Sequence, residues 1–132
     1  MAAKTIADKL LIKPGGTVWI STAEHRALVG PLPDGATHAG TPGEAAVAVL
    51  FAADAAQVRR LLDEHRDGLP TTIWIAYPKG NKADINRDTL WPIVAGYGLR
   101  PNGQVAMDEV WSALRFRPLK PGEARFTGGR SA

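Results

Sequence analysis

The residues with the clearest chemical potential lie in residues 71–82, where an apolar run ends in the motif YPKG followed by Asn81 and Lys82. Backbone N–H groups and lysine ammonium groups at the start of a helix can hold a phosphate or another anion. Lys79 could instead act as a general acid or base beside a carboxylate, or form a structural ion pair. The residue types leave these three roles open.

A strand has to carry this loop, because residues 73–75 are β-branched or aromatic and unbroken by charge. Such a run predicts a strand that is buried on both faces of a mostly parallel sheet. Similar runs at residues 18–20 and 46–51 predict two more internal strands. Ligands bind beyond the carboxyl ends of the strands in open α/β sheets. The loop after Tyr77 is therefore the first candidate for a site.

Apolar residues at helical spacing predict helices over residues 5–11, 54–65 and 84–98. The second has the clearest pattern, with a capping-box sequence at its start and a glycine just past its end. Pro92 leaves two alternatives for the third helix. If Asp88 is the N-cap, Pro92 lies in the first turn and destabilises the helix little. If the helix begins at residue 84, Pro92 is an interior residue and kinks the helix.

The order of these elements predicts the fold class. Residues 23–46 are broken by prolines and glycines and leave room for one helical turn and one short edge strand. Two further strands, at residues 104–107 and 111–117, form a closing hairpin. We expect an α/β fold, a three-layer Rossmann-like sandwich whose mostly parallel sheet ends in a C-terminal antiparallel hairpin. It forms a single domain over residues 1–117, followed by a flexible basic tail at 118–132.

The predicted site combines this hairpin with the end of the central strand. The hairpin turn should reach the same sheet edge, because the strand before it runs parallel to the central strand. That edge also collects Ser21 and Thr22. The predicted ligand-binding residues or charge network are Tyr77, Lys79, Asn81, Lys82, Asp84, Arg87, Asp108, Glu109 and Ser112. We assign them no catalytic role, and the scattered histidines show no metal-ligand spacing.

The composition narrows the function classes. The chain has 132 residues, 45% of them hydrophobic, with a net charge of +3 and no cysteine. No apolar run approaches the roughly 20 residues of a membrane span, and the N-terminus lacks the apolar core of a signal peptide. We therefore expect a cytoplasmic protein with no membrane partner. The sequence lacks clustered basic residues with interleaved aromatics and the full Walker spacing, which argues against nucleic-acid binding and nucleoside triphosphatase activity.

Several segments resemble a truncated class I methyltransferase core, namely IKPGGTVWI, VAVLF, WIAYPKG and the closing hairpin. That family binds S-adenosylmethionine with a glycine-rich turn after the first strand and an acidic residue after the second. In this sequence the first turn reads STAEH, with no glycine, and the second segment reads GATHAG, with no acid. We therefore predict no cofactor from the resemblance.

A more specific resemblance is carried by YPKG, ADINRDTLWP and DEVWSALRFRP. These motifs are similar to a bacterial family known as domain of unknown function 3052, which is common in actinobacteria. The residues that match the family pattern are Trp74, Pro78, Lys79, Asp84, Asp108, Glu109, Trp111 and Ser112. The resemblance implies the same fold and the same candidate site, and it implies no reaction.

Three functions remain open from the sequence. The favoured expectation is a non-catalytic binding or regulatory module that holds a small anionic molecule or a protein partner at the carboxyl edge of the sheet. The first alternative is a divergent methyltransferase-like enzyme. The second is a nucleic-acid-associated protein that uses the basic residues between positions 115 and 130.

Overall fold

The computed structural model describes residues 5–65, 68–70, 72–79, 87–118 and 122. The strands in this part of the chain are β1 Thr17–Ile20, β2 Thr37–His38, β3 Val47–Phe51, β4 Thr72–Pro78, β5 Leu99–Ala106 and β6 Trp111–Pro118. The helices are α1 Ile6–Lys9, α2 Arg26–Val29, α3 Ala55–His65 and α4 Arg87–Ala95, with 3-10 turns η1 Ala23–His25 and η2 Pro42–Glu44. No helix in the described residues is both long and apolar enough to cross a membrane. Most of the predicted tail at 118–132 lies outside them.

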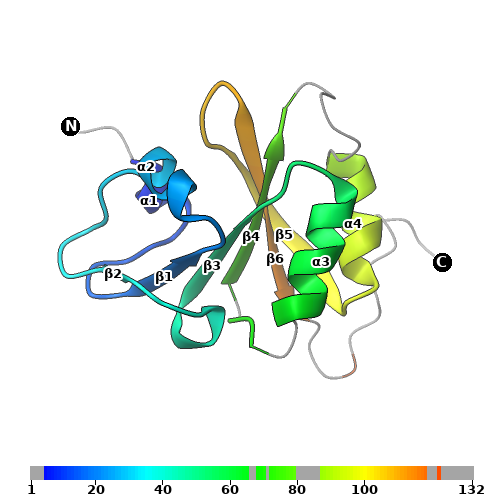
Figure 1. The fold of residues 1–132 in the computed structure, drawn as a ribbon, viewed down its shortest axis with the longest axis horizontal. Helices are drawn as coiled ribbons and strands as arrows, with labels where there is room; N and C mark the ends of the chain where they lie inside the picture. Colours follow the sequence, from blue (N-terminus) through cyan, green and yellow to red (C-terminus); the bar gives the residue numbers. More distant parts are fainter. Residues whose placement is uncertain (1–4, 66–67, 71, 80–86, 119–121, 123–132) are drawn as a thin grey trace.

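The strands form one sheet in the order β2-β1-β3-β4-β6-β5. The strands β2, β1, β3 and β4 are parallel, β6 is antiparallel to β4, and β5 is antiparallel to β6. The β5–β6 turn and the end of β4 therefore lie at the same edge, the upper one in Figure 1. This confirms the predicted Rossmann-like sheet with its antiparallel C-terminal hairpin.

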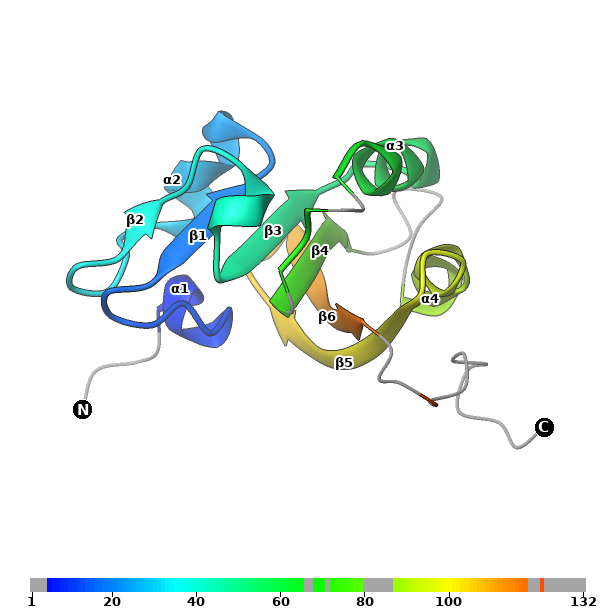
Figure 2. The same ribbon diagram turned by 90° about the horizontal axis from the view of Figure 1, so that it is seen from below.

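Helices cover both faces of the sheet, which gives the three predicted layers. One core cluster joins the sheet to α3 and α4 and contains Leu62 and Leu90. The other cluster joins the opposite face to α1 and α2 and contains Leu10 and Val29. Figure 2 shows α1 and α3 on opposite sides of the strands. Burial on both faces explains why β3 and β4 consist of continuous apolar runs rather than alternating ones.

Side-chain caps fix where two of the helices begin. In α1 the amide of Asp8 donates to Thr5 Oγ1 over 3.1 Å, and the amide of Thr5 donates to the Asp8 carboxylate over 3.2 Å. In α3 the amide of Gln57 donates to Asp54 Oδ1 over 2.9 Å. Each bond satisfies an amide that has no partner inside its helix, so short polar patterns in the sequence set both helix starts.

Among the element boundaries that differ from the sequence-based expectation, those of β5 and α4 involve a proline. The strand β5 begins at Leu99 rather than at residue 104. Pro101 and Gly103 are residue types common in loops, but the register shifts between them, and this irregularity accommodates both residues within the strand. In α4, Asp88 lies inside the helix, so the interpretation of Asp88 as the N-cap is wrong. Pro92 is an interior residue of α4.

The connection from β2 to β3 is unlike the other crossovers. Helices α2, α3 and α4 fill the connections after β1, β3 and β4, whereas the segment before β3 contains only the turn η2. Trp19 of β1 belongs to the core cluster on the α3 side of the sheet. With no α-helix in the β2–β3 connection, the space over Trp19 beside α3 becomes part of a groove.

Candidate functional site

The end of β4 meets the β5–β6 turn, as the topology predicts, but through backbone groups. The amide of Lys79 donates to the carbonyl of Val110 over 2.8 Å, and its ammonium group donates to the backbone carbonyl of Asp108. The Asp108 carboxylate instead accepts the amides of Val110, at 2.8 Å, and Trp111, at 2.7 Å. Within the described residues, Lys79 therefore has no carboxylate partner, and its bonds fasten the hairpin to the central strand.

Two other predicted site residues, Tyr77 and Ser112, pair across β4 and β6, and the side-chain amide of Gln104 donates to their hydroxyl oxygens over 3.4 Å and 3.5 Å. Tyr77 and Ser112 are buried, and the Ser112 hydroxyl donates to the Val105 carbonyl over 3.2 Å. Glu109 is exposed in the hairpin turn. Asn81, Lys82 and Asp84 lie outside the described residues, and Arg87 begins α4 with a side chain that is not described. Anion binding by this set of residues stays a prediction.

The variant Asp108→Ala tests whether the Asp108 carboxylate stabilises the β5–β6 turn. Replacing Asp108 with alanine removes the acceptor of two amides, and we expect the free energy of unfolding to fall by about 1–2 kcal/mol. Urea denaturation monitored by circular dichroism measures the change. The neighbouring Glu109→Ala is the matched control, because Glu109 is exposed, and we expect a change within about 0.5 kcal/mol. Equal losses in the two variants would contradict this account of the turn.

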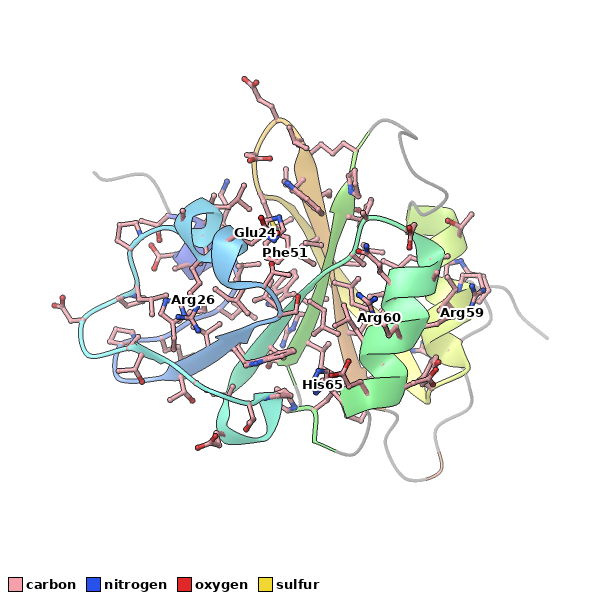
Figure 3. The ribbon with its side chains drawn as sticks, viewed as in Figure 1. Glu24, Arg26, Phe51, Arg59, Arg60 and His65 are labelled. Carbon is pink, nitrogen blue, oxygen red and sulfur yellow. The ribbon has the colours of Figure 1, made fainter. Side chains whose placement is uncertain are left out.

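A groove of about 590 Å³ lies between the β1–α2 connection and helix α3. Its walls come from the carboxyl ends of β1 and β3, from one side of α3, and from Trp111 at the start of β6. In Figure 3, Glu24 and Phe51 lie near its upper end and His65 near its lower end, beside α3. The groove therefore starts at the sheet edge where ligands bind in open α/β folds and continues along α3.

Aromatic side chains form two parts of this wall. The His25 ring stacks on Phe51 with a centroid distance of 4.2 Å and an interplanar angle of 3°. Trp111 meets both rings edge-on, at 5.1 Å from His25 and 5.2 Å from Phe51. Further along, Trp19 and His65 are in edge contact at 4.7 Å. The groove thus offers flat apolar surface at both ends, which suits a ligand with a planar ring.

Polar groups fix the turn after β1. The amide of Phe51 donates to Ser21 Oγ over 2.8 Å, which ties the end of β1 to the end of β3. The Thr22 hydroxyl is hydrogen-bonded to Nδ1 of His25 and holds the imidazole in place. The charged side chains of the groove are Glu24, Arg60 and Glu64, all exposed. Glu64 Oε1 lies 3.8 Å from His65 Nε2, and the exposed carboxylates of Glu24 and Glu64 can accept hydrogen bonds from hydroxyl or cationic groups of a ligand.

The carboxyl end of β2 carries a histidine rather than an acid. Partial desolvation lowers the pKa of the exposed His38, and the positive charge of Arg26 lowers it further. The next acidic residue along the chain, Glu44, lies in η2 just before β3, at the opposite edge of the sheet, where its carboxylate accepts a bond from Thr41 over 3.0 Å. A carboxylate directly after the second strand is thus absent, as the sequence indicated.

Sequence reasoning missed most of this groove. The sequence gives no sign of a role for His25 or His65, yet both are half-buried in aromatic contacts. A usable signal was present in α3, where Gln57, Leu61 and Glu64 recur at helical spacing beside the buried positions. A mixed polar and apolar stripe next to the core-facing stripe indicates a helix that borders a groove.

Comparison with known proteins identifies the fold. No protein-family model and no curated protein matches the sequence. Among solved structures, a protein of the NADB-Rossmann superfamily from Streptococcus agalactiae has a TM-score of 0.56 at 9% identity, over 96% of this chain and 72% of that one. The tRNA methyltransferase TrmK of B. subtilis has a TM-score of 0.54 at 10% identity, over 89% of this chain and 67% of that one.

A third structure was solved with a ligand. It is a Streptococcus pneumoniae protein in complex with S-adenosyl-L-methionine, with a TM-score of 0.53 at 9% identity, over 97% of this chain and 77% of that one. At identities this low, the structural similarity shows a shared Rossmann-like fold, which is also found in methyltransferases. They correct the favoured expectation of a non-catalytic binding or regulatory module, because the structural neighbours include methyltransferases and favour the methyltransferase-like alternative.

Proposed function

We propose that this chain is a divergent methyltransferase-like enzyme whose groove between β1 and α3 binds S-adenosylmethionine and, after transfer, its demethylated product. The observation that carries the proposal is the position of the groove at the carboxyl ends of β1 and β3, in a fold that methyltransferases share. Its volume of about 590 Å³ is also within the range of roughly 300–1,000 Å³ that is usual for small-molecule sites.

The turn after β1 determines whether such a ligand would be held by backbone groups or by side chains. A glycine-rich turn lets the backbone approach the ligand. Here Ser21 has a side chain instead, and its Oγ already accepts a hydrogen bond from the amide of Phe51. The groove therefore fits an adenosyl group through side chains. Trp19 and His65 offer aromatic surface to the adenine ring, and the carboxylates of Glu24 and Glu64 can accept bonds from ribose hydroxyls.

Bound S-adenosylmethionine would supply a methyl group activated by its positive sulfonium. The contribution of this chain is to bind and orient that ligand. The rings of His25, Phe51 and Trp111 pack together at the end of the groove that lies nearest the carboxyl edge, with Phe51 buried and Trp111 partly exposed. Aromatic rings attract cations, so the partly exposed Trp111 is suited to the positive sulfonium of the ligand.

The proposal is compatible with the resemblance to the domain of unknown function 3052 family. Most residues that carry that resemblance lie in and around β4 and in the β5–β6 hairpin, and only Trp111 belongs also to the groove. Lys79 and Asp108 fasten this hairpin to β4 and so set the position of Trp111. In this account the family motif supports one wall of the ligand site rather than forming the site itself.

The proposal predicts binding that depends on the groove carboxylates. Isothermal titration calorimetry of the full chain should show saturable binding of S-adenosylmethionine and its demethylated product. We expect the double variant Glu24→Gln with Glu64→Gln to weaken binding by about ten-fold or more, because hydrogen bonds to charged acceptors are lost. Both residues are exposed, so the fold should be retained.

The control for this experiment is Glu44→Gln. This exposed acid undergoes the same change of charge, but it lies in η2, outside the groove. The affinity of Glu44→Gln for both ligands should equal that of the original protein. Failure of both ligands to bind at millimolar concentration would overturn the proposal, and so would an equal loss of affinity in the Glu44→Gln control.

A further inference from the structure

A second groove lies at the opposite edge of the sheet. It has a volume of about 520 Å³ and is bordered by the loop before β1 and by the amino ends of β1, β3 and β4, together with Arg115 of β6. It shares no lining residue with the groove between β1 and α3. Whatever it binds therefore occupies a different place from the proposed adenosyl ligand.

The charge of this second groove is one-sided. Two cationic side chains, Lys13 and Arg115, line it, and none of its described lining residues is acidic. The groove between β1 and α3, in contrast, contains acidic as well as basic residues. Two positive charges without a facing carboxylate favour an anionic ligand, because an ion of opposite charge offsets their mutual repulsion.

Arg115 has hydrogen-bonding capacity that the protein does not use. Its Nε atom is buried and has no partner among the described residues. A buried N–H group without an acceptor is unfavourable, and such groups are uncommon in folded proteins. The guanidinium nitrogens form a planar fork that matches two oxygens of a phosphate or carboxylate. An oxyanion in the groove would bind a guanidinium group that the protein leaves incompletely hydrogen-bonded.

Two residues with positive φ lie next to Arg115 or line the groove. Gly103, which pairs with Arg115 across β5 and β6, has a φ of 149° and no side chain to cover the arginine. Leu11 also lines the groove with a φ of 67°, the one non-glycine residue at positive φ in the described chain, and it remains 40% exposed. A strained, exposed leucine beside two cations is the kind of feature that occurs at ligand sites.

We propose that this groove binds a phosphate-bearing ligand, with Arg115 and Lys13 on the phosphate and Leu11 and Val47 against an apolar part of the same molecule. A phosphate monoester carries about −1.5 to −2 charges at neutral pH, which matches two cations better than the single charge of a carboxylate does. The inference goes beyond the proposed methyltransferase-like function, since the two grooves lie at opposite edges of the sheet.

Titration with phenyl phosphate tests this assignment, because that probe joins a phosphate to an apolar ring. NMR spectra of the full chain at constant ionic strength should show saturable shifts centred on residues 11–17 and Arg115. We expect Arg115→Gln to weaken binding by about ten-fold or more, and Lys13→Gln by a smaller factor. Lys13 is exposed, so Lys13→Gln remains informative if Arg115→Gln does not fold.

Two comparisons make the result decisive. Arg59→Gln removes one positive charge from the exposed side of α3, outside both grooves, and should leave the affinity unchanged. Benzoate, which carries a carboxylate on the same ring, should bind more weakly than phenyl phosphate. The assignment is overturned if phenyl phosphate fails to saturate, if Arg59→Gln weakens binding as much as Lys13→Gln, or if benzoate binds equally well. Lys13→Gln should bind the demethylated product of S-adenosylmethionine as the original protein does, because that ligand is proposed to occupy the other groove.

Discussion

Replacing Trp74 with alanine is expected to lower the free energy of unfolding by about 3–5 kcal/mol. Trp74 lies in the central strand β4 and is only 2% exposed. It packs in the core cluster that joins the sheet to α1, which includes Ala7 and Leu10. Its indole Nε1 also donates to the Leu10 carbonyl over 2.8 Å. The substitution therefore removes both a large apolar surface and the bond that fastens the end of α1 to the sheet.

The variant Trp74→Phe separates these two contributions. Phenylalanine retains much of the packing but leaves the Leu10 carbonyl without its donor, a loss of about 1–3 kcal/mol for a buried group. Urea denaturation followed by circular dichroism measures both variants. If Trp74→Phe were as stable as the original protein, the indole bond would contribute nothing and the alanine result would reflect packing alone.

The second large effect is expected for Leu62→Ala, with a loss of about 2–5 kcal/mol. Leu62 is fully buried in α3 and belongs to the core cluster beneath α3 and α4. Its neighbour Leu61 is only partly buried and lines the groove beside Trp19. The same substitution at Leu61 should therefore remove less buried surface and cause a smaller loss of stability.

This pair of leucines also distinguishes the core from the site. We expect Leu61→Ala to weaken binding of the demethylated product of S-adenosylmethionine by several-fold, because it removes apolar groove surface. Leu62→Ala should bind that ligand normally at temperatures where the variant is folded. Thermal unfolding and calorimetric titration of both variants measure the two properties. Normal binding by Leu61→Ala would show that this part of the groove does not contact the ligand.

Much of the fold was predictable because its determinants are local. All of β3 and residues 73–76 of β4 are apolar, so the sequence itself indicates strands that are buried on both faces. The start of α3 follows from Asp54 and Gln57, whose spacing is that of a helix cap. The extent of β5 was not predictable in this way, because Pro101 and Gly103 are usual loop residues, and pairing with β6 overrides their preference.

The candidate site was predictable only in part. Topology alone indicated that the β5–β6 turn meets the end of β4, and Lys79 and Asp108 are indeed in contact. The sequence could not show that the bond reaches a backbone carbonyl while the carboxylate caps its own turn. Nor could it show the groove over Trp19, since a tryptophan in an apolar strand gives no sign of whether the segment after β2 will cover it.

The two outermost strands also determine how this sheet meets other molecules. β2 contains only Thr37 and His38, so it offers few free amides and carbonyls to another chain. At the opposite edge, β5 contains Pro101, which lacks an amide hydrogen, and an irregular register next to Gly103. Short, proline-bearing or irregular edge strands disfavour pairing between sheets. The irregular segment that pairs with Arg115 thus also protects the protein from edge-to-edge aggregation.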